Sequence, residues 1–271
     1  MPDNTNNIPK IMGILNVTPD SFFQDSRLDN LLLENFNFNN ADILDVGFES
    51  SRPGAMPVTE QDEIKRLDYF LHNFHPIHDM LSIDTYKPAV ARLALENGFN
   101  IINDIKGGGE DGEMLEIASF FNCPIIIMHM KGYPLTMQNK PYYDNIIDEL
   151  LYYFENKIAL AKQIGLSDEQ IILDPGIGFG KRVVDNDIII NNISKLKNFG
   201  FPVLVGVSRK SFLSVDDDSS EKRLSASLGV STLAVLNGAN IIRTHDIEET
   251  YRMLTVINRV QQSRYHSARI S

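Results

Sequence analysis

The sequence contains a single cysteine, Cys123, among 271 residues, so no disulfide can form within the chain. A protein without disulfides is typical of a reducing compartment. No apolar run approaches the roughly 20 residues that a membrane-spanning helix needs. The polar segment Met1 to Ile8 lacks the basic and apolar regions of a signal peptide. We therefore expect a cytoplasmic protein that does not bind membranes.

Positive charge is also scarce, because 25 Lys and Arg residues are set against 36 Asp and Glu residues, for a net charge of −11. A balance this acidic disfavours binding to nucleic acid or to an anionic membrane surface. It does not exclude a small anionic substrate, since a few cations in one pocket can set the local field. The 12 prolines and a hydrophobic content of 43% argue against disorder.

Eight short apolar runs, rich in Ile, Leu and Val, each end in a polar or charged residue. Runs this short, apolar on both faces and bounded by turn residues, are typical of buried parallel strands. The runs cover residues 10–16, 42–45, 80–84, 100–104, 124–129, 170–174, 202–208 and 240–245. Helical patterns are clearest at 59–72, 88–97, 142–164, 185–199, 221–237 and 248–262, and weak at 28–40.

This βα period, repeated eight times, predicts the α/β class and a closed (β/α)₈ TIM barrel. The length is close to the usual barrel size of about 250 residues. We expect a single domain over residues 1–271, with the barrel at about 10–264. Active sites of such barrels lie at the C-terminal ends of the strands, where the polar residues of the eight runs fall.

The segments after the strands carry the specific signal. In chain order they include Asn16-Val-Thr-Pro-Asp-Ser-Phe22, Glu49-Ser-Ser-Arg-Pro53, Asp84-Thr-Tyr-Lys87, Asn103-Asp-Ile105, Met128-His-Met130, Asp174-Pro-Gly-Ile-Gly-Phe-Gly-Lys181, Gly206-Val-Ser-Arg-Lys210 and Arg243-Thr-His245. Each motif alone is weak evidence. Together, in this order, they resemble dihydropteroate synthase, the sulfonamide-target enzyme of folate synthesis, over nearly the whole chain.

The resemblance implies a transferase that condenses (7,8-dihydropterin-6-yl)methyl diphosphate with 4-aminobenzoate. The products are 7,8-dihydropteroate and pyrophosphate. It also implies Mg²⁺ as a cofactor and a homodimer. We expect a dissociative substitution, because the pterin methylene can delocalise positive charge into the ring after pyrophosphate leaves. The aromatic amine is unprotonated at neutral pH, so the reaction needs no nucleophilic side chain.

A pterin presents a guanidine-like donor edge that a carboxylate can accept in a two-point hydrogen bond. Asp174 is placed for that role, and Lys210 can reach the ring carbonyl as a point-charge donor. Taken singly, an Asp or Asn at a strand end is as often a helix cap or turn former. The resemblance assigns the pterin site to Asp84, Asn103, Ile105, Met128, Asp174, Phe179, Gly206 and Lys210.

Pyrophosphate needs cations, and the guanidinium of arginine offers a bidentate fork for phosphate oxygens. The resemblance assigns this site to Asn16, Arg52, Arg243 and His245, with Asn16 as the Mg²⁺ ligand. Two alternatives stay open: Arg243 as a structural ion-pair partner, and His245 as a hydrogen-bonded core group. The residues expected to act in catalysis are Asp84, Lys210, Arg243 and His245.

4-Aminobenzoate needs an apolar slot with a contact for its carboxylate. The resemblance assigns this slot to Phe22, Ser51, Arg52, Pro53, Phe179 and Ser208. Phe and Pro residues in loops could instead serve simple packing. The glycines of residues 176–180 do not have the dinucleotide-binding spacing and are expected to let the loop turn sharply beside a ligand.

The chain departs from the family pattern in two loops. Phe48 stands where a glycine is usual and Ser51 where threonine is usual, so affinity for 4-aminobenzoate can differ. Residues 23–27 lack the usual glycines, so the first loop is expected to close differently. Two other functions stay open: a non-catalytic pterin-binding homologue, and a methyltetrahydrofolate:corrinoid methyltransferase domain. The latter would need neither the pyrophosphate cations nor the Ser208-Arg-Lys210 turn.

Overall fold

All eight strands of the computed structural model run parallel in one sheet, as the apolar runs predict. The strands β1 to β6 pair in chain order, and β8 pairs with both β1 and β7. A bridge between Leu173 and Val203 joins β6 to the start of β7, so the sheet closes as a TIM barrel. The strands are β1 Lys10–Asn16, β2 Ile43–Gly47, β3 Leu81–Asp84, β4 Ile101–Asp104, β5 Ile125–Met128, β6 Ile171–Asp174, β7 Leu204–Val205 and β8 Ile241–Thr244.

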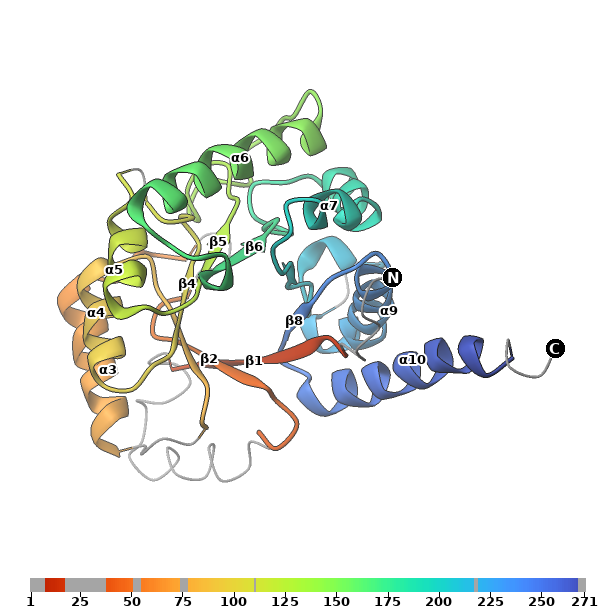
Figure 1. The fold of residues 1–271 in the computed structure, drawn as a ribbon, viewed down its shortest axis with the longest axis horizontal. Helices are drawn as coiled ribbons and strands as arrows, with labels where there is room; N and C mark the ends of the chain where they lie inside the picture. Colours follow the sequence, from red (N-terminus) through yellow and green to blue (C-terminus); the bar gives the residue numbers. More distant parts are fainter. Residues whose placement is uncertain are drawn as a thin grey trace.

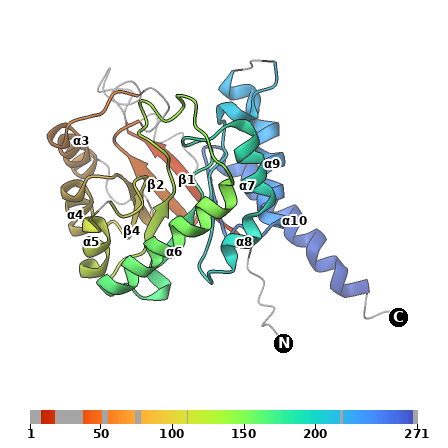
Figure 2. The same cartoon turned by 90° about the horizontal axis from the view of Figure 1, so that it is seen from above.

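The structure describes residues 8–17, 38–50, 55–73, 78–109, 111–216 and 219–267. Helices surround the strands (Figure 1), with α3 to α6 on one side of the barrel and α7, α9 and α10 on the other (Figure 2). The helices are α3 Glu60–Asn73, α4 Pro88–Glu96, α5 Glu113–Phe121, α6 Ile146–Ile164, α7 Val183–Asn191, α8 Ile193–Lys197, α9 Leu224–Leu236 and α10 Ile247–Ser267, with short 3₁₀ turns η1 Asp168–Gln170, η2 Ser211–Leu213 and η3 Ser220–Arg223.

The expected helix boundaries need four corrections. Helix α6 begins after Asn145, not at Tyr142, because the Asn145 side chain caps it by accepting from the Ile147 amide at 3.1 Å. The expected helix 185–199 is broken at Asn192, whose φ of −119° is not helical. The segment 221–237 opens with a 3₁₀ turn, η3, before α9. The sequence pattern missed α5, which begins directly after Gly112 in the left-handed region.

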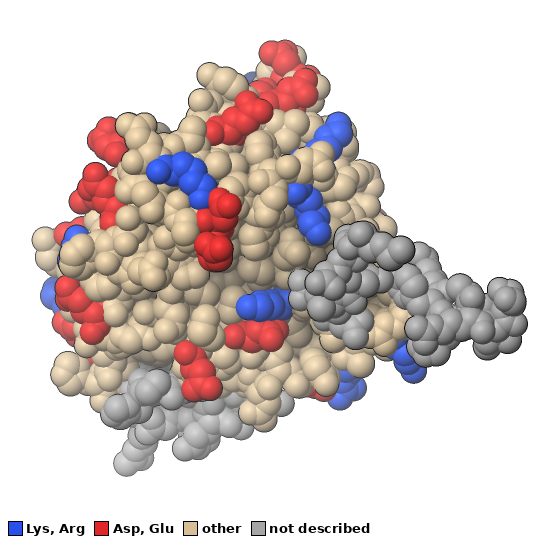
Figure 3. Space-filling model, viewed as in Figure 1, with Lys and Arg blue, Asp and Glu red and all other residues tan. Residues whose placement is uncertain are grey.

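The weak pattern at 28–40 falls mostly outside the described residues, and residues 38–40 form no helix. Among the described helices, none has the length and apolar character to cross a bilayer. On the face shown in Figure 3, lysines and arginines lie singly among acidic side chains and do not gather into a basic patch.

One apolar layer fills the N-terminal half of the barrel interior. Its residues come from seven strands, near the start of each, and all are buried. They are Met12, Ile43, Ile101, Ile126, Ile172, Leu204 and Ile241. Because side chains on a strand alternate between its two faces, the residue two positions further along each strand also faces the interior. We call this layer the floor of the barrel, and the polar residues of the barrel mouth lie above it.

Candidate active site

Two positions beyond the floor, the interior changes from apolar to polar. The residues at this level include Asp45, Asn103, Met128, Asp174, Gly206 and Arg243, each two positions after a floor residue on its own strand. Five of these were expected at the site from the sequence. Asp45 was not, although it is fully buried.

Arg243 lies at the centre of this level and bridges two carboxylates. Its Nε donates to Oδ2 of Asp45 at 2.6 Å, and its Nη2 donates to Oδ2 of Asp84 at 2.6 Å. Asn103 donates from Nδ2 to the same Asp45 oxygen at 2.9 Å. Arg243 is therefore an ion-pair partner in this structure, as one of the two open alternatives expected. Asp45 joins Arg243, expected at the pyrophosphate, to Asn103, expected at the pterin.

Burial shifts the ionisation of these groups in opposite directions. It raises the pKa of Asp84 to about 7, while Arg243 opposes this rise and Asp45 adds to it. Burial alone would lower the pKa of Arg243, but the carboxylates of Asp45 and Asp84 raise it above its ordinary value. The guanidinium therefore stays charged, and Asp84 is the group whose charge changes near neutral pH.

A second cluster lies across the barrel, at the ends of β6 and β7. The Gly176 amide donates to Oδ1 of Asp174 at 2.7 Å, and burial raises the pKa of Asp174 while Lys210 opposes that rise. The Lys210 ammonium donates to the carbonyl of Ile177 and lies 4.5 Å from the centre of the Phe179 ring. Burial lowers the pKa of Lys210 to about 8, against the pull of Asp174. Three residues expected around the pterin are thus neighbours.

The glycines of the β6 loop turn it sharply, as expected. Gly176, Gly178 and Gly180 all have positive φ, at 66°, 81° and 62°. At Gly178 an added Cβ would lie 3.0 Å from Cδ of Lys210, so a side chain there would crowd the lysine.

The ends of β7 and β8 bring Ser208 and His245 together. Ser208 Oγ lies 3.1 Å from Nδ1 of His245, and the His245 amide donates to the same hydroxyl at 3.2 Å. Between Ser208 and Lys210, Arg209 has a φ of 58° and pairs with Asp246. The ion pair holds this left-handed turn, on one side of which Ser208 contacts His245. On the other side, Lys210 contacts the loop after β6.

Asn16 ends β1 and faces Asp84 across Gly47. A Cβ added to Gly47 would lie 3.5 Å from Oδ2 of Asp84 and 3.7 Å from Oδ1 of Asn16. Within the described ranges, no three acidic, histidine or cysteine side chains gather as a metal site. A single amide oxygen fits Mg²⁺ that takes its other oxygens from pyrophosphate and water, so the residues present suit the expected ion.

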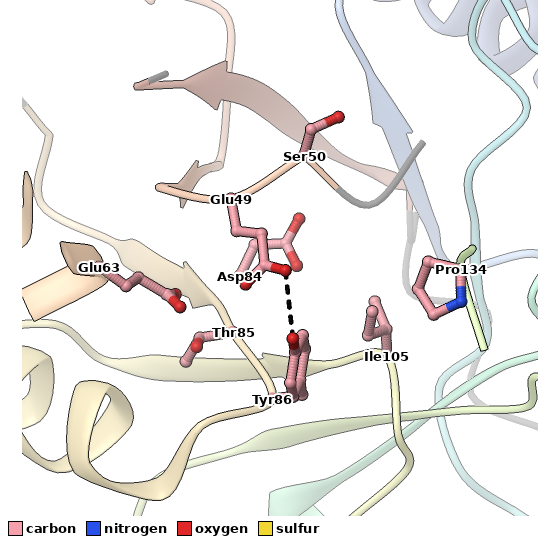
Figure 4. A pocket seen from close by; sticks show the side chains of 8 residues that line it. All are labelled: Glu49, Ser50, Glu63, Asp84, Thr85, Tyr86, Ile105 and Pro134. Atoms are coloured by element: carbon pink, nitrogen blue, oxygen red, sulfur yellow. Dashed lines mark hydrogen bonds between the residues drawn. The ribbon is translucent and has the colours of Figure 1, made fainter. Parts of the chain in front are cut away.

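A small open hollow lies at the mouth beside Asp84. Figure 4 shows Glu49 and Asp84 at its centre, with Glu63 on one side and Ile105 on the other. Glu49 accepts from the Tyr86 hydroxyl at 3.1 Å and from the Val58 amide at 3.3 Å. It also pairs with Lys87, as does Glu63. Glu49 lies just before segment 50–57, which contains the strand-two loop, and its side chain accepts from Val58 just after that segment. Glu49 thus holds the two ends of the segment together.

Four expected site residues lie outside the described residues: Phe22, Ser51, Arg52 and Pro53. The structure does describe Phe48, the residue that replaces a usual glycine. It is fully buried and packs against Phe70 at 5.6 Å, with the ring edge toward the ring face. Because Phe48 follows the inward-facing Gly47, it points into the core between β2 and α3, so this departure does not alter the wall of the site.

Asp45 could have been found from the sequence. It interrupts an apolar strand at the position two residues after Ile43, which strand alternation turns toward the barrel axis. The run 42–45 ends in this carboxylate, but the resemblance assigned it no role. Lys181 was also missed, since a lysine in a glycine-rich loop is usually exposed, whereas this one is buried.

Comparisons with known proteins agree with this geometry. The family model described as pterin binding enzyme matches residues 12–245. Dihydropteroate synthase of Escherichia coli strain K12 is 40% identical over 257 residues, which cover 92% of this chain and 90% of that protein.

Two solved structures are similar in fold over nearly their whole length. Yersinia pestis dihydropteroate synthase in complex with a sulfonamide drug has a TM-score of 0.87 and 34% identity, covering 95% of this chain and 96% of that one. The Xanthomonas albilineans dihydropteroate synthase with 4-aminobenzoic acid has a TM-score of 0.83 and 33% identity, covering 95% and 94%. The chain therefore belongs to the pterin-binding enzymes and, within them, to the dihydropteroate synthase family.

Proposed function

We propose that this chain condenses (7,8-dihydropterin-6-yl)methyl diphosphate with 4-aminobenzoate, forming 7,8-dihydropteroate and pyrophosphate. The observation that carries the proposal is the polar level above the barrel floor, where Arg243 bridges Asp45 and Asp84 opposite the Asp174–Lys210 cluster. Membership of the dihydropteroate synthase family supports the same reaction.

The pterin would lie between the two clusters. Asp174 accepts from the donor edge of the ring, and Lys210 donates to the ring carbonyl. Asn103, held by Asp45, offers an amide to the ring edge. Ile105, Met128 and Gly206 complete the surround, and Gly206 lies beside Arg243, since an added Cβ would be in van der Waals contact with Cβ of Arg243 at 3.5 Å.

The pyrophosphate would lie above β8 and β1. Arg243 and His245 come from β8, and Asn16 from its neighbour β1. Arg52 would join them from the strand-two loop. Mg²⁺, held there by Asn16, would supply positive charge for the leaving group. Arg243 can turn from its carboxylate partners toward the phosphate oxygens when the substrate arrives, which would leave Asp84 available to the pterin.

Loss of pyrophosphate would leave positive charge on the pterin methylene and ring. Two buried carboxyl groups, Asp84 and Asp174, face that charge and would stabilise it. The amine of 4-aminobenzoate then attacks the methylene and forms the C–N bond, and the proton that its nitrogen loses passes to the departing pyrophosphate or to water. Phe179, with Phe22 and Pro53, would hold the benzoate ring, and Ser208, with Ser51 and Arg52, its carboxylate.

A homodimer fits the apolar surface of three neighbouring helices. Helices α7, α9 and α10 lie together on one side of the barrel (Figure 2). The exposed apolar side chains on them are Val183, Val184 and Ile188 on α7, Leu233 and Leu236 on α9, and Tyr251, Val256 and Val260 on α10. A twofold pair would bury this surface. Sedimentation of the wild type and of Leu233→Glu tests it, and two monomeric proteins would contradict it.

The direct test of the reaction is pyrophosphate release from the pterin diphosphate with Mg²⁺, with and without 4-aminobenzoate. The proposal expects release that depends on 4-aminobenzoate, together with formation of dihydropteroate. Retained pterin binding without turnover would instead identify a non-catalytic homologue.

A further inference from the structure

Lys181 is a buried lysine that the proposed reaction does not use. It follows Gly180 in the loop after β6, and only 3% of its surface is exposed. Its Nζ donates to the carbonyl of Phe179 at 3.0 Å and to the carbonyl of His129 at 3.1 Å. The same atom lies 3.0 Å from Nδ1 of His129. The ammonium therefore joins the end of β5 to the loop after β6.

The arrangement satisfies every donor of the ammonium. A charged lysine has three N–H groups, and three acceptors surround this one. Nδ1 of His129 can accept only if it carries no proton, and burial and the nearby Lys181 both lower the pKa of His129 well below its ordinary value. Burial lowers the pKa of Lys181 to about 7, while Asp174 opposes this fall. A buried cation is costly unless it is fully hydrogen-bonded, so the charged form of this lysine depends on its three acceptors.

The two loops also touch through their backbones at two glycines. A Cβ added to Gly176 would lie 2.0 Å from the carbonyl oxygen of His129, and one added to Gly180 would lie 2.2 Å from that of Lys131. Gln138 donates from Nε2 to the Gly178 carbonyl at 2.6 Å. The Tyr143 hydroxyl donates to the Gly180 carbonyl at 2.8 Å. The loops after β5 and β6 therefore form one packed unit, in which Lys181 and Tyr143 are buried cross-links and Gln138 is an exposed one.

Phe179 is the residue that this unit holds at the barrel mouth. Its carbonyl accepts from Lys181, and its amide donates to the Gly176 carbonyl at 3.1 Å. Its backbone is thus fixed on both sides, while its half-buried ring lies against Lys210. A movement of this backbone would displace the ring, although Asp174 and Asn103 would keep their places on strands β6 and β4.

We propose that Lys181 is a positioning residue for the 4-aminobenzoate half of the reaction, which acts by fixing the backbone of Phe179 from the end of β5. This inference rests on the proposed function, in that it takes Phe179 as a wall of the 4-aminobenzoate slot. In this proposal Lys181 contacts neither substrate. It connects the end of β5 to Phe179, and so affects how a slot formed by other loops binds 4-aminobenzoate.

The variant Lys181→Met keeps the chain length of the side chain and removes its hydrogen bonds. We expect the KM for 4-aminobenzoate to rise roughly tenfold or more, since a displacement of about 1 Å can cost a hundredfold in rate. The KM for the pterin diphosphate should rise less, within about twofold, because Phe179 is shared with the pterin site but the other residues assigned to the pterin lie on other elements. If Lys181 had a purely structural role, Lys181→Met would lower the thermal stability and the yield of active enzyme. It would not raise the KM for 4-aminobenzoate more than the KM for the pterin diphosphate.

Lys131→Met is the matched control. Lys131 belongs to the same β5 loop, but it is exposed and binds Tyr142 and Glu149 on the outer side. Its loss should leave both KM values unchanged. Equal rises in the KM for 4-aminobenzoate in the two variants would overturn the proposal, because they would show that any weakening of the loop has this effect.

A double-mutant cycle with Phe179→Leu tests the route of the effect. If Lys181 acts through Phe179, Lys181→Met should add little to the KM for 4-aminobenzoate once the ring is lost. Additive effects would overturn the proposal. If Lys181→Met does not fold, the exposed Gln138→Ala takes its place in the cycle, with the same two outcomes. If the wild type is active and Phe179→Leu leaves the KM for 4-aminobenzoate unchanged, the role of Phe179, and with it this inference, is refuted while the proposed function stands. An inactive wild type would instead refute the proposed function.

Discussion

The hydroxyl oxygen of Ser208 lies 3.1 Å from Nδ1 of His245. The residue expected to hold the carboxylate of 4-aminobenzoate is therefore in contact with one expected to hold pyrophosphate. Each comes from one of two neighbouring strands, β7 and β8. An anion that fixes the His245 ring would also fix the direction of the Ser208 hydroxyl, so the two ligands should affect each other's affinity.

We predict that a sulfonamide or 4-aminobenzoate binds the free enzyme weakly and binds more tightly with pyrophosphate and Mg²⁺ present. Coupling between two sites typically changes affinity by about 5-fold to 150-fold. Ser208→Ala should reduce this gain, because it removes the hydroxyl that joins the sites. Calorimetry with and without pyrophosphate measures the effect. Ser211→Ala, an exposed residue of the same loop, is the control, and an equal sulfonamide affinity in both conditions would show a preformed slot.

Asp174→Asn should weaken pterin binding by roughly tenfold to a hundredfold, the range for a charge-assisted hydrogen bond of about 1.5 to 3 kcal/mol. The Gly176 amide donates to one oxygen of Asp174. In the asparagine variant this amide would keep the side-chain oxygen, so the NH₂ group would face the donor edge of the pterin. Titration with a pterin that lacks pyrophosphate measures the loss. The exposed Asp187→Asn should bind normally, and unchanged affinity in Asp174→Asn would remove this residue from the pterin site.

The strands could be predicted within one or two residues for most of the barrel, because a strand buried on both faces is a continuous apolar run. The exception is β7, where the run 202–208 forms a ladder over Leu204–Val205 only. The alternation within each run also holds the information that places Asp45 beside Arg243. The site assignments followed the resemblance, which gave Asp45 no role, and did not use that alternation.

The remaining differences depend on contacts that a single sequence does not display. The sequence pattern did not predict the start of α5 because glycines precede it. Gly109 and Gly112 both have positive φ values, and the helix begins directly after Gly112. The partners of Lys181 come from residues 52 positions earlier and two positions earlier. Only the closed barrel brings the end of β5 and the β6 loop together, so its burial followed from topology and not from local pattern.

Arg243→Lys should lower turnover by roughly tenfold to a thousandfold, the scale for removing one charge-stabilising donor from a transition state. Lysine keeps the charge but not the fork that reaches both Asp45 and Asp84, and later the phosphate oxygens. Pyrophosphate release at saturating substrates measures the loss. Arg243→Ala should in addition destabilise the fold by about 3 to 5 kcal/mol, because it leaves two buried carboxyl groups without their cation. Wild-type stability in the alanine variant would show that the ion pairs contribute little.

The final prediction concerns the pH dependence of stability through Asp84. Burial, its largest cause, raises the pKa of this carboxyl to about 7 in the folded protein, from 3.8 in the unfolded chain. Between these values the folded state keeps a proton that the unfolded state has released, so the contribution of Asp84 to stability is full below pH 3.8 and falls as the pH rises to 7. The wild type should therefore lose stability relative to Asp84→Asn over this interval, by at most about 1.4 kcal/mol per pH unit.

Urea unfolding of both proteins at several pH values between 4 and 8 measures this difference. The slope of Asp84→Asn itself reports the other groups that titrate there, among them Asp104, whose pKa burial raises to about 6. Subtracting it isolates Asp84. Arg243 acts against burial, since its Nη2 donates to Asp84 at 2.6 Å. If this ion pair outweighed burial, the folded pKa would lie below 3.8, and the wild type would show no loss against Asp84→Asn between pH 4 and 7. A falling difference that levels off above about pH 7 would establish that burial dominates, and that Asp84 exchanges a proton in the range where the enzyme works.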